Sequence, residues 1–186
     1  MDLDTLLNPE QIKAVKHIEG PLLVLAGAGS GKTRCVTYRI LHLIEQGVPP
    51  ERILGVTFTN KAAKEMKERI EKLCHKHVLI CTYHSLCARI LRQSIELLDY
   101  QPNFVIYDEE DAEKIIRACL EELNLQHYKL EPKAIKSAIS NAKDKGEEHE
   151  KASCTASADP LSRHFPAIYS CYQKKLKEYN ALDFDD

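Results

Sequence analysis

The sequence lacks the features that mark membrane and secreted proteins. No apolar run in its 186 residues approaches the roughly 18 residues that a bilayer-spanning helix needs. The first residues, MDLDTLLNPEQ, are acidic, whereas a signal peptide begins with basic residues and continues with an apolar stretch. We therefore expect a cytoplasmic protein without a membrane partner.

Disulfide and zinc frameworks are also missing. The seven cysteines are odd in number, and most lie in apolar periodic stretches, where a thiol acts as a small hydrophobic group. Cysteines and histidines crowd together in residues 74–87, but residues 78–82 have the pattern of a buried strand, which sends alternate side chains to opposite faces. The tight CxxC pairs of structural zinc sites do not occur. We expect reduced cysteines that are mostly structural.

The composition is that of an ordinary globular protein, with 44% apolar and 29% charged residues. Disordered and collagen-like chains are thereby excluded. The charge is unevenly distributed, because residues 1–93 hold 14 Lys and Arg against 9 Asp and Glu, whereas residues 94–186 hold 12 against 19. A basic first half suits a polyanionic ligand, and an acidic second half does not.

Apolar strands and helices alternate through the first half. Asn8-Pro9-Glu10-Gln11 has the pattern of a helix start with a capping box, and its helix should run to about Glu19. Strands are predicted at residues 22–25, 53–58 and 78–82, each followed by a helix, the second of which Asn60 should open. This alternation predicts a parallel sheet covered on both faces.

The strand signal stops soon after the midpoint. A last apolar stretch at residues 104–107 precedes Asp108, which can cap a helix. Further helices are predicted at residues 132–145 and 161–179, separated by a charged linker without period at residues 146–160. The second half is therefore expected to be an all-helical subdomain.

A phosphate-binding loop stands between the first strand and its helix. Its residues are Ala26, Gly27, Ala28, Gly29, Ser30, Gly31, Lys32 and Thr33. The glycines let backbone N–H groups converge on phosphate oxygens at a helix N-terminus. Lys32 is expected to reach the β- and γ-phosphates, and the Thr33 hydroxyl to take a coordination site on Mg²⁺. These two residues are the predicted catalytic pair, with ATP and Mg²⁺ as cofactors.

A nucleotidase also needs a carboxylate to hold its metal ion. Asp108-Glu109 follows an apolar stretch, as such a carboxylate does in many phosphate-loop proteins. The alternative is that Asp108 only caps the next helix, where acidic residues are favoured by the helix dipole. The pattern alone leaves both interpretations open.

Five segments occur in the order and approximate spacing of the UvrD/PcrA/Rep superfamily 1 DNA helicases, which the chain resembles along its whole length. They are Asn8-Pro9-Glu10-Gln11, AGAGSGKT from Ala26, TFTNKAAKEM from Thr57, Thr82-Tyr83-His84-Ser85 and Leu182-Asp183-Phe184-Asp185-Asp186. The resemblance implies an α/β fold with an incomplete RecA-like P-loop NTPase parallel sheet and an inserted all-helical subdomain. The implied parts are residues 1–107 for the motor domain, 108–179 for the insertion and 180–186 for the return segment.

The resemblance further implies the N-terminal portion of an ATP-dependent 3′–5′ DNA helicase. Its partners would be single-stranded DNA, ss/ds junctions and accessory repair or replication proteins. In that family the metal carboxylates lie downstream of residues 182–186, which disfavours a metal role for Asp108. The alternative is a catalytically silent fragment that only binds nucleotide or DNA. A small-molecule kinase is disfavoured because no arginine-rich lid is present.

Two residues resemble the family's adenine contacts. Gln11 matches the glutamine that reads the adenine edge, although the capping box gives it an equally good structural role. Arg34 resembles the arginine that lies against the adenine face, although a solvated arginine on a first helical turn is the alternative.

The resemblance assigns the strand ends to single-stranded DNA. The residues concerned are Thr57, Phe58, Thr59, Asn60, Lys61, Thr82, Tyr83 and His84. Phe58 resembles a base-stacking aromatic residue, and a flat ring accepts any base. The alternative is that Phe58 fills the core like other strand residues. Lys61 is the weakest of these assignments, since surface lysines are usually only solvated.

Overall fold

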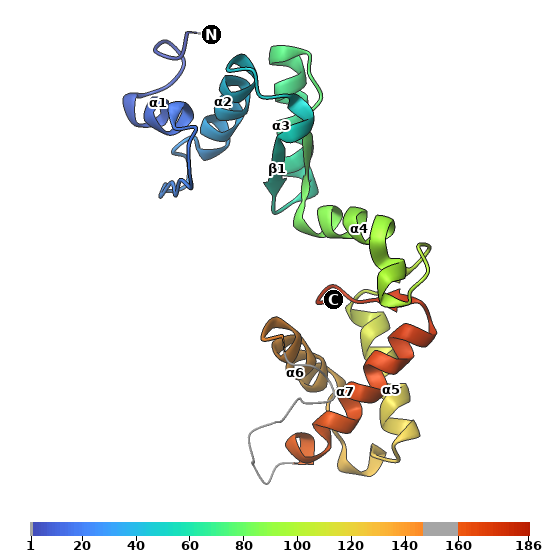
Figure 1. Cartoon of the computed structure of the whole chain (residues 1–186). Coiled ribbons are helices and arrows are strands. Elements are labelled where there is room, and N and C mark those ends of the chain that lie inside the picture. The colour runs from blue at the N-terminus through green and yellow to red at the C-terminus, as the bar shows by residue number, and fades with distance from the viewer. Residues whose placement is uncertain (1, 147–159) are drawn as a thin grey trace. The chain divides into compact units, whose positions relative to one another are not determined.

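The computed structural model describes residues 2–146 and 160–186, so most of the predicted linker at residues 146–160 lies outside the described residues (Figure 1). The chain forms two compact units, residues 1–88 and 89–186, with the division inside helix α4 (Tyr83–Ser94). Among the described residues, no helix combines the length and the apolar character needed to cross a membrane.

The first unit alternates strands and helices as expected. Its elements are α1 (Pro9–Lys16), α2 (Lys32–Glu45), the 3-10 turn η1 (Pro50–Arg52), β1 (Leu54–Thr57), α3 (Asn60–Cys74), β2 (Leu79–Thr82) and the start of α4. Strands β1 and β2 pair in parallel, which confirms the strands predicted at residues 53–58 and 78–82. The buried core includes Val15 of α1, Ile40 of α2, Ile70 of α3 and Ile80 of β2.

Side-chain caps fix where the helices of this unit begin. At α1 the Asn8 side chain accepts a hydrogen bond from the Gln11 N–H at 2.9 Å, and the Gln11 side chain accepts one from the Asn8 N–H at 3.1 Å. This confirms the predicted capping box. Helix α3 begins at Asn60, as predicted, and its cap is Thr59, whose Oγ1 accepts a hydrogen bond from the Ala62 N–H at 3.1 Å.

The strand predicted at residues 22–25 is wrong. Residues 21–27 form no regular secondary structure, and the side chains of Leu23 and Leu25 are 81% and 87% exposed. A strand is stabilised by hydrogen bonds to a neighbouring strand, and in the described part of the first unit residues 21–27 pair with neither β1 nor β2.

The second unit is built around three helices. It contains the 3-10 turn η2 (Ile95–Leu98), β3 (Val105–Ile106), α5 (Glu109–Glu122), the 3-10 turn η3 (Gln126–Tyr128), α6 (Pro132–Asp144), α7 (Pro160–Glu178) and β4 (Ala181–Leu182). Helices α5, α6 and α7 pack against one another (Figure 1). The apolar periodicity predicted this core, which includes Ile116, Ile135, Ile139, Ile168 and Tyr172.

Two short strands flank the three helices of the second unit, and both lie outside the helical subdomain predicted at residues 108–179. Strand β3 lies within the apolar stretch predicted at residues 104–107 and pairs in parallel with β4, which was not predicted. The Val105 N–H donates to the Asn180 carbonyl at 3.0 Å and the Tyr107 N–H to the Leu182 carbonyl at 2.8 Å. The chain therefore enters and leaves the three helices at adjacent points.

Candidate functional site

The phosphate loop ends where helix α2 begins. Gly31 is the N-cap of α2, with a φ of 83°, and Gly29 has a φ of 76°. Both values lie in the left-handed region that side chains with a Cβ rarely adopt. A Cβ added to Gly31 would also stand 2.8 Å from the Gln11 side-chain nitrogen. The loop conformation thus requires glycine at these positions.

The Lys32 ammonium lies on the loop's own carbonyl groups. Its Nζ donates hydrogen bonds to the Gly27 carbonyl at 2.6 Å and the Ala26 carbonyl at 3.0 Å. Lys32 is exposed, so these bonds to neutral oxygens compete with water. An anionic phosphate oxygen is a stronger acceptor, which leaves Lys32 ready to exchange its partners.

Gln11 joins helix α1 to the phosphate loop. Its Oε1 serves the capping box, while its Nε2 donates to the Ser30 carbonyl at 3.0 Å. Ser30 is further held by its hydroxyl, which donates to the Gly27 carbonyl at 2.8 Å. Both ends of the Gln11 amide are therefore in use within the chain. The capping role is confirmed, and the adenine role stays a prediction.

The loop has the donors that a phosphate group needs. Within residues 2–146 and 160–186, the N–H groups of Gly29, Gly31 and Lys32 make no hydrogen bond. The first turn of α2 carries no acidic residue, so nothing there opposes the positive end of the helix dipole. Thr33 follows in the same turn and is exposed. These residues fit a nucleotide phosphate accompanied by Mg²⁺.

Arg34 lies beside a shallow cationic pocket. Its guanidinium stands 5.8 Å from the centre of the Tyr38 ring on the same helix. The two residues line an open pocket of about 430 Å³ together with Arg69, Lys72 and Leu73 of α3. Arg34 is exposed, as both interpretations of the sequence allow.

The predicted DNA-binding residues meet at one end of the β1–β2 pair. Thr57 and Thr82 are register partners at the ends of β1 and β2, so Phe58 and Tyr83 follow at the same carboxyl edge. Phe58 is 92% exposed and Tyr83 is 65% exposed. Phe58 therefore does not fill the core, which removes the structural alternative to a binding role.

Local hydrogen bonds shape this edge. The Thr57 hydroxyl donates to the Thr59 carbonyl at 3.0 Å, and Thr59 caps α3. On the second strand, the Thr82 hydroxyl is buried and lies 2.8 Å from the Ser85 hydroxyl. The remaining candidates stand exposed in the first turns of the following helices, and these are Asn60, Lys61 and His84.

Asp108 has a structural role that the sequence left open. Its Oδ1 accepts a hydrogen bond from the Asp111 N–H at 3.0 Å, so that it caps α5. Among the described residues no three His, Cys, Asp or Glu side chains are grouped so as to hold a metal ion.

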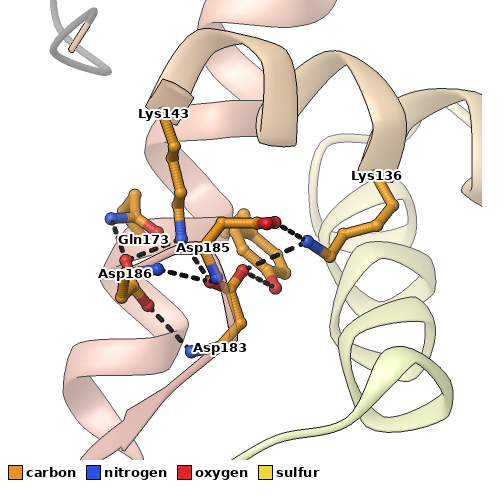
Figure 2. Close-up of polar contacts among 7 residues, drawn as sticks. Lys136, Lys143, Gln173, Asp183, Asp185 and Asp186 are labelled. Carbon is orange, nitrogen blue, oxygen red and sulfur yellow. Dashed lines mark hydrogen bonds and ion pairs between the residues drawn. The ribbon is translucent and has the colours of Figure 1, made fainter. Parts of the chain in front are cut away.

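A buried polar cluster in the second unit was not predicted (Figure 2). Asp183 is 5% exposed, and its carboxylate accepts hydrogen bonds from Lys143 at 2.9 Å and from the Tyr172 hydroxyl at 2.8 Å. Burial alone would raise the pKa of Asp183, but the Lys143 charge and these hydrogen bonds outweigh burial and lower the pKa to about 2. Burial and the Asp183 charge raise the pKa of Tyr172.

The sequence contained a signal for this cluster. Lys136 and Lys143 are seven residues apart on α6, and each follows a residue of the buried stripe, Ile135 or Ala142. This spacing places both lysines at the border of the apolar face. The carboxylates of residues 183–186 have no such spacing signal, because their segment indicates only the family resemblance.

Comparison with known proteins identifies the family. The family model described as UvrD/REP helicase N-terminal domain matches residues 7–186. The chain belongs to the UvrD/REP helicase N-terminal domain family. Its phosphate loop, its exposed Phe58 and its helical unit all lie within the matched range.

Several relatives of this family member are DNA helicases by name. The chain is 44% identical over 184 residues to "ATP-dependent DNA helicase PcrA" of Staphylococcus aureus (strain Mu50) and 46% identical to the protein of that name from Bacillus subtilis (strain 168). A third such protein, from Staphylococcus epidermidis, is 44% identical. Each alignment covers 97% of this chain but 25% of the relative, so the chain spans about a quarter of their length.

Proposed function

We propose that residues 1–88 carry the nucleotide site and part of the single-stranded DNA site of an ATP-dependent DNA helicase that moves 3′ to 5′. The observation that carries the proposal is the combination, in one compact unit, of a phosphate loop opening α2 and an exposed Phe58 at the carboxyl edge of a parallel strand pair. Ligands of α/β sheets bind at this edge. Membership of the UvrD/REP family supports the proposal.

Lys32 is the residue that recognises the phosphates in this proposal. On ATP binding its ammonium exchanges the Ala26 and Gly27 carbonyls for phosphate oxygens, while the N–H groups of Gly29 and Gly31 donate to the same anion. Thr33 would hold the Mg²⁺ ion, which neutralises phosphate charge when bound. The exchange replaces bonds to neutral oxygens by bonds to charged ones, and therefore favours binding.

Adenine recognition is assigned to Gln11 and Arg34. Gln11 already contacts the loop through Ser30, so its amide lies next to the phosphate site. To read an adenine edge it must release the Ser30 carbonyl or share its amide between two partners. Arg34 is exposed one residue after Thr33 and is free to lie against a base.

The DNA surface combines stacking with charge. Phe58 and Tyr83 offer two exposed rings from adjacent strand ends, and stacking on a ring does not depend on base identity. Lys61 stands in the first turn of α3, where its charge can meet a phosphate. Binding of this kind suits an enzyme that moves along any sequence.

We also propose that residues 108–179 are a helical insertion in the motor domain and that residues 180–186 return the chain to it. The supporting observation is the parallel pairing of β3 with β4, which brings the entry and exit of the three helices together. A segment inserted into a sheet must leave and return at neighbouring points.

The 186-residue chain alone is proposed to bind ATP without turning it over. An arginine supplied by a second domain contributes about 10³–10⁵ to the rate in related nucleotidases. A phosphate-release assay with saturating oligo-dT should therefore give no turnover above background. Turnover that disappears in Asp108→Asn would instead make Asp108 a metal ligand, whereas its present contact is the α5 cap.

The experiment that tests the proposed function measures both ligands on one protein. Titration of the chain with ATP and Mg²⁺, and separately with fluorescein-labelled oligo-dT, should give saturable binding of each. Lys32→Ala should remove the first and leave the second, and Phe58→Ala should do the reverse. If each folded variant lost binding of both ATP and oligo-dT, the two ligands would not bind at separate surfaces.

A further inference from the structure

The segment after β4 forms a reciprocal capping box. The Asp183 Oδ1 accepts hydrogen bonds from the Asp185 N–H at 2.9 Å and the Asp186 N–H at 3.1 Å. In return the Asp183 N–H donates to the Asp186 Oδ2 at 2.8 Å. This is the pattern of a helix start with Asp183 as N-cap and Asp186 as its third helical residue. Residues 184–186 form a turn with the hydrogen bonds of a helix start.

This turn concentrates negative charge. Asp183, Asp185 and Asp186 place three carboxylates within four residues, and Asp183 is buried. Carboxylates this close repel one another, and a buried carboxylate without a partner is strongly destabilising. The hydrogen bonds of the capping box therefore stabilise the turn, whereas repulsion among its three carboxylates destabilises it.

Two lysines from α6 compensate this charge (Figure 2). The Lys143 Nζ donates to the Asp183 Oδ1 at 2.9 Å and to the Asp186 Oδ1 at 2.6 Å, so that one ammonium joins both members of the capping box. Lys136 is hydrogen-bonded to Asp185 and lies 3.6 Å from the Asp183 Oδ2. The Lys143 side chain is 6% exposed, which shields its ion pairs from solvent.

Other elements contribute neutral partners. The Tyr172 hydroxyl of α7 donates to the Asp183 Oδ2 at 2.8 Å, and the Gln173 amide donates to Asp186 at 3.5 Å. Tyr100, from the segment before β3, has its pKa raised by burial and then by the charges of Asp186 and Asp183. The positive charges that face the turn within the described residues thus come from α6.

We propose that Lys143 is a positioning residue that makes the capping-box turn at residues 183–186 conditional on the docking of α6. With α6 in place, the Lys143 ammonium bridges the Asp183 and Asp186 carboxylates and offsets their repulsion. With α6 displaced, the same carboxylates repel and the turn opens. Because the turn directly follows β4, which pairs with β3, the packing of α6 is coupled to the point where the chain leaves the helices.

The test compares Lys143→Met with wild type in the full 186-residue chain. Amide hydrogen exchange by NMR reports the turn, because the Asp185 and Asp186 N–H groups are protected by the Asp183 carboxylate. Their exchange should become at least about tenfold faster in the variant. The carboxyl ¹³C titration of Asp183 should move from about 2 to higher pH.

Controls separate positioning from general stability. Lys133→Met removes an exposed lysine from the first turn of α6. It should leave the amide exchange of the turn and the titration of Asp183 unchanged. Lys143→Arg keeps the charge and should restore most of the protection. Should Lys143→Met fail to fold, Asp186→Ala removes one half of the box at a less buried position and should speed exchange at Asp185. Wild-type exchange and an unmoved Asp183 titration in a folded Lys143→Met or Asp186→Ala chain would overturn the proposal.

Discussion

Thr57 and Thr82 face each other as register partners in the last positions of β1 and β2. The residues that follow them, Phe58 and Tyr83, are both exposed aromatic side chains. Parallel strands end at the same edge, so both residues lie at the carboxyl edge of the strand pair. The proposed DNA surface depends on this relationship.

Phe58→Ala should weaken oligo-dT binding by about 1–3 kcal/mol through lost stacking. The stability of the chain should not change, because the ring is 92% exposed. The slope of log affinity against log salt should also stay the same, since stacking releases no counterions. Fluorescence anisotropy over a range of salt concentrations separates these quantities.

Leu97→Ala is the matched control for this experiment, because Leu97 is an apolar side chain that is 86% exposed in the second unit. It should bind oligo-dT like wild type. Equal oligo-dT affinities for wild type and Phe58→Ala would mean that other residues form the DNA-binding surface.

Two substitutions of Gln11 should distinguish the roles of its two side-chain hydrogen bonds. Gln11→Ala removes both the capping box and the bond to Ser30 and should lower the free energy of unfolding by about 1 kcal/mol. Gln11→Glu keeps an acceptor for the Asn8 N–H but cannot donate to the Ser30 carbonyl. It should therefore keep α1 stable and weaken ATP binding. Calorimetric unfolding and nucleotide titration of the two variants measure these effects. Identical behaviour of the two variants in both assays would show that Gln11 does not have separate roles in the α1 cap and in the phosphate loop.

Acid should weaken the second unit through Asp183. Its folded-state pKa of about 2 lies below the ordinary value of 3.8. The stabilisation is therefore complete above about pH 4 and is lost as the pH falls towards 2, with a size of about 2 kcal/mol. Urea unfolding at several pH values measures the loss. Asp183→Asn should flatten the dependence in this window, and an unchanged dependence would show that other carboxylates cause it.

Local patterns predicted much of this fold. The helices of the second unit follow from apolar residues at helical spacing, and the caps at Asn8 and Asp108 follow from side chains that bond to nearby N–H groups. These signals involve residues within one or two turns of each other, so a single sequence contains them.

Features that depend on distant partners could not be predicted in this way. Residues 22–25, LLVL, are more apolar than β1, LGVT, but a strand also needs a neighbouring strand, and the sequence of residues 22–25 does not specify one. The bond from Gln11 to Ser30 spans 19 residues, and the contact of Lys143 with Asp183 spans 40. The phosphate loop can be predicted because it is a local motif. The ion pairs between α6 and residues 183–186 are visible only in the tertiary structure.

We propose that the loop at residues 26–33 binds a nucleotide through Lys32. Isothermal titration of the 186-residue chain with ATP and Mg²⁺ measures this binding. The variant is Lys32→Ala, and the control is Lys16→Ala, which changes an exposed lysine in the last turn of α1. Lys32→Ala should fold normally and lose affinity by on the order of a hundredfold or more, because charge-assisted bonds to phosphate are removed. Lys16→Ala should bind like wild type. A folded Lys32→Ala chain that binds ATP and Mg²⁺ with unchanged affinity would show that Lys32 does not recognise the phosphates.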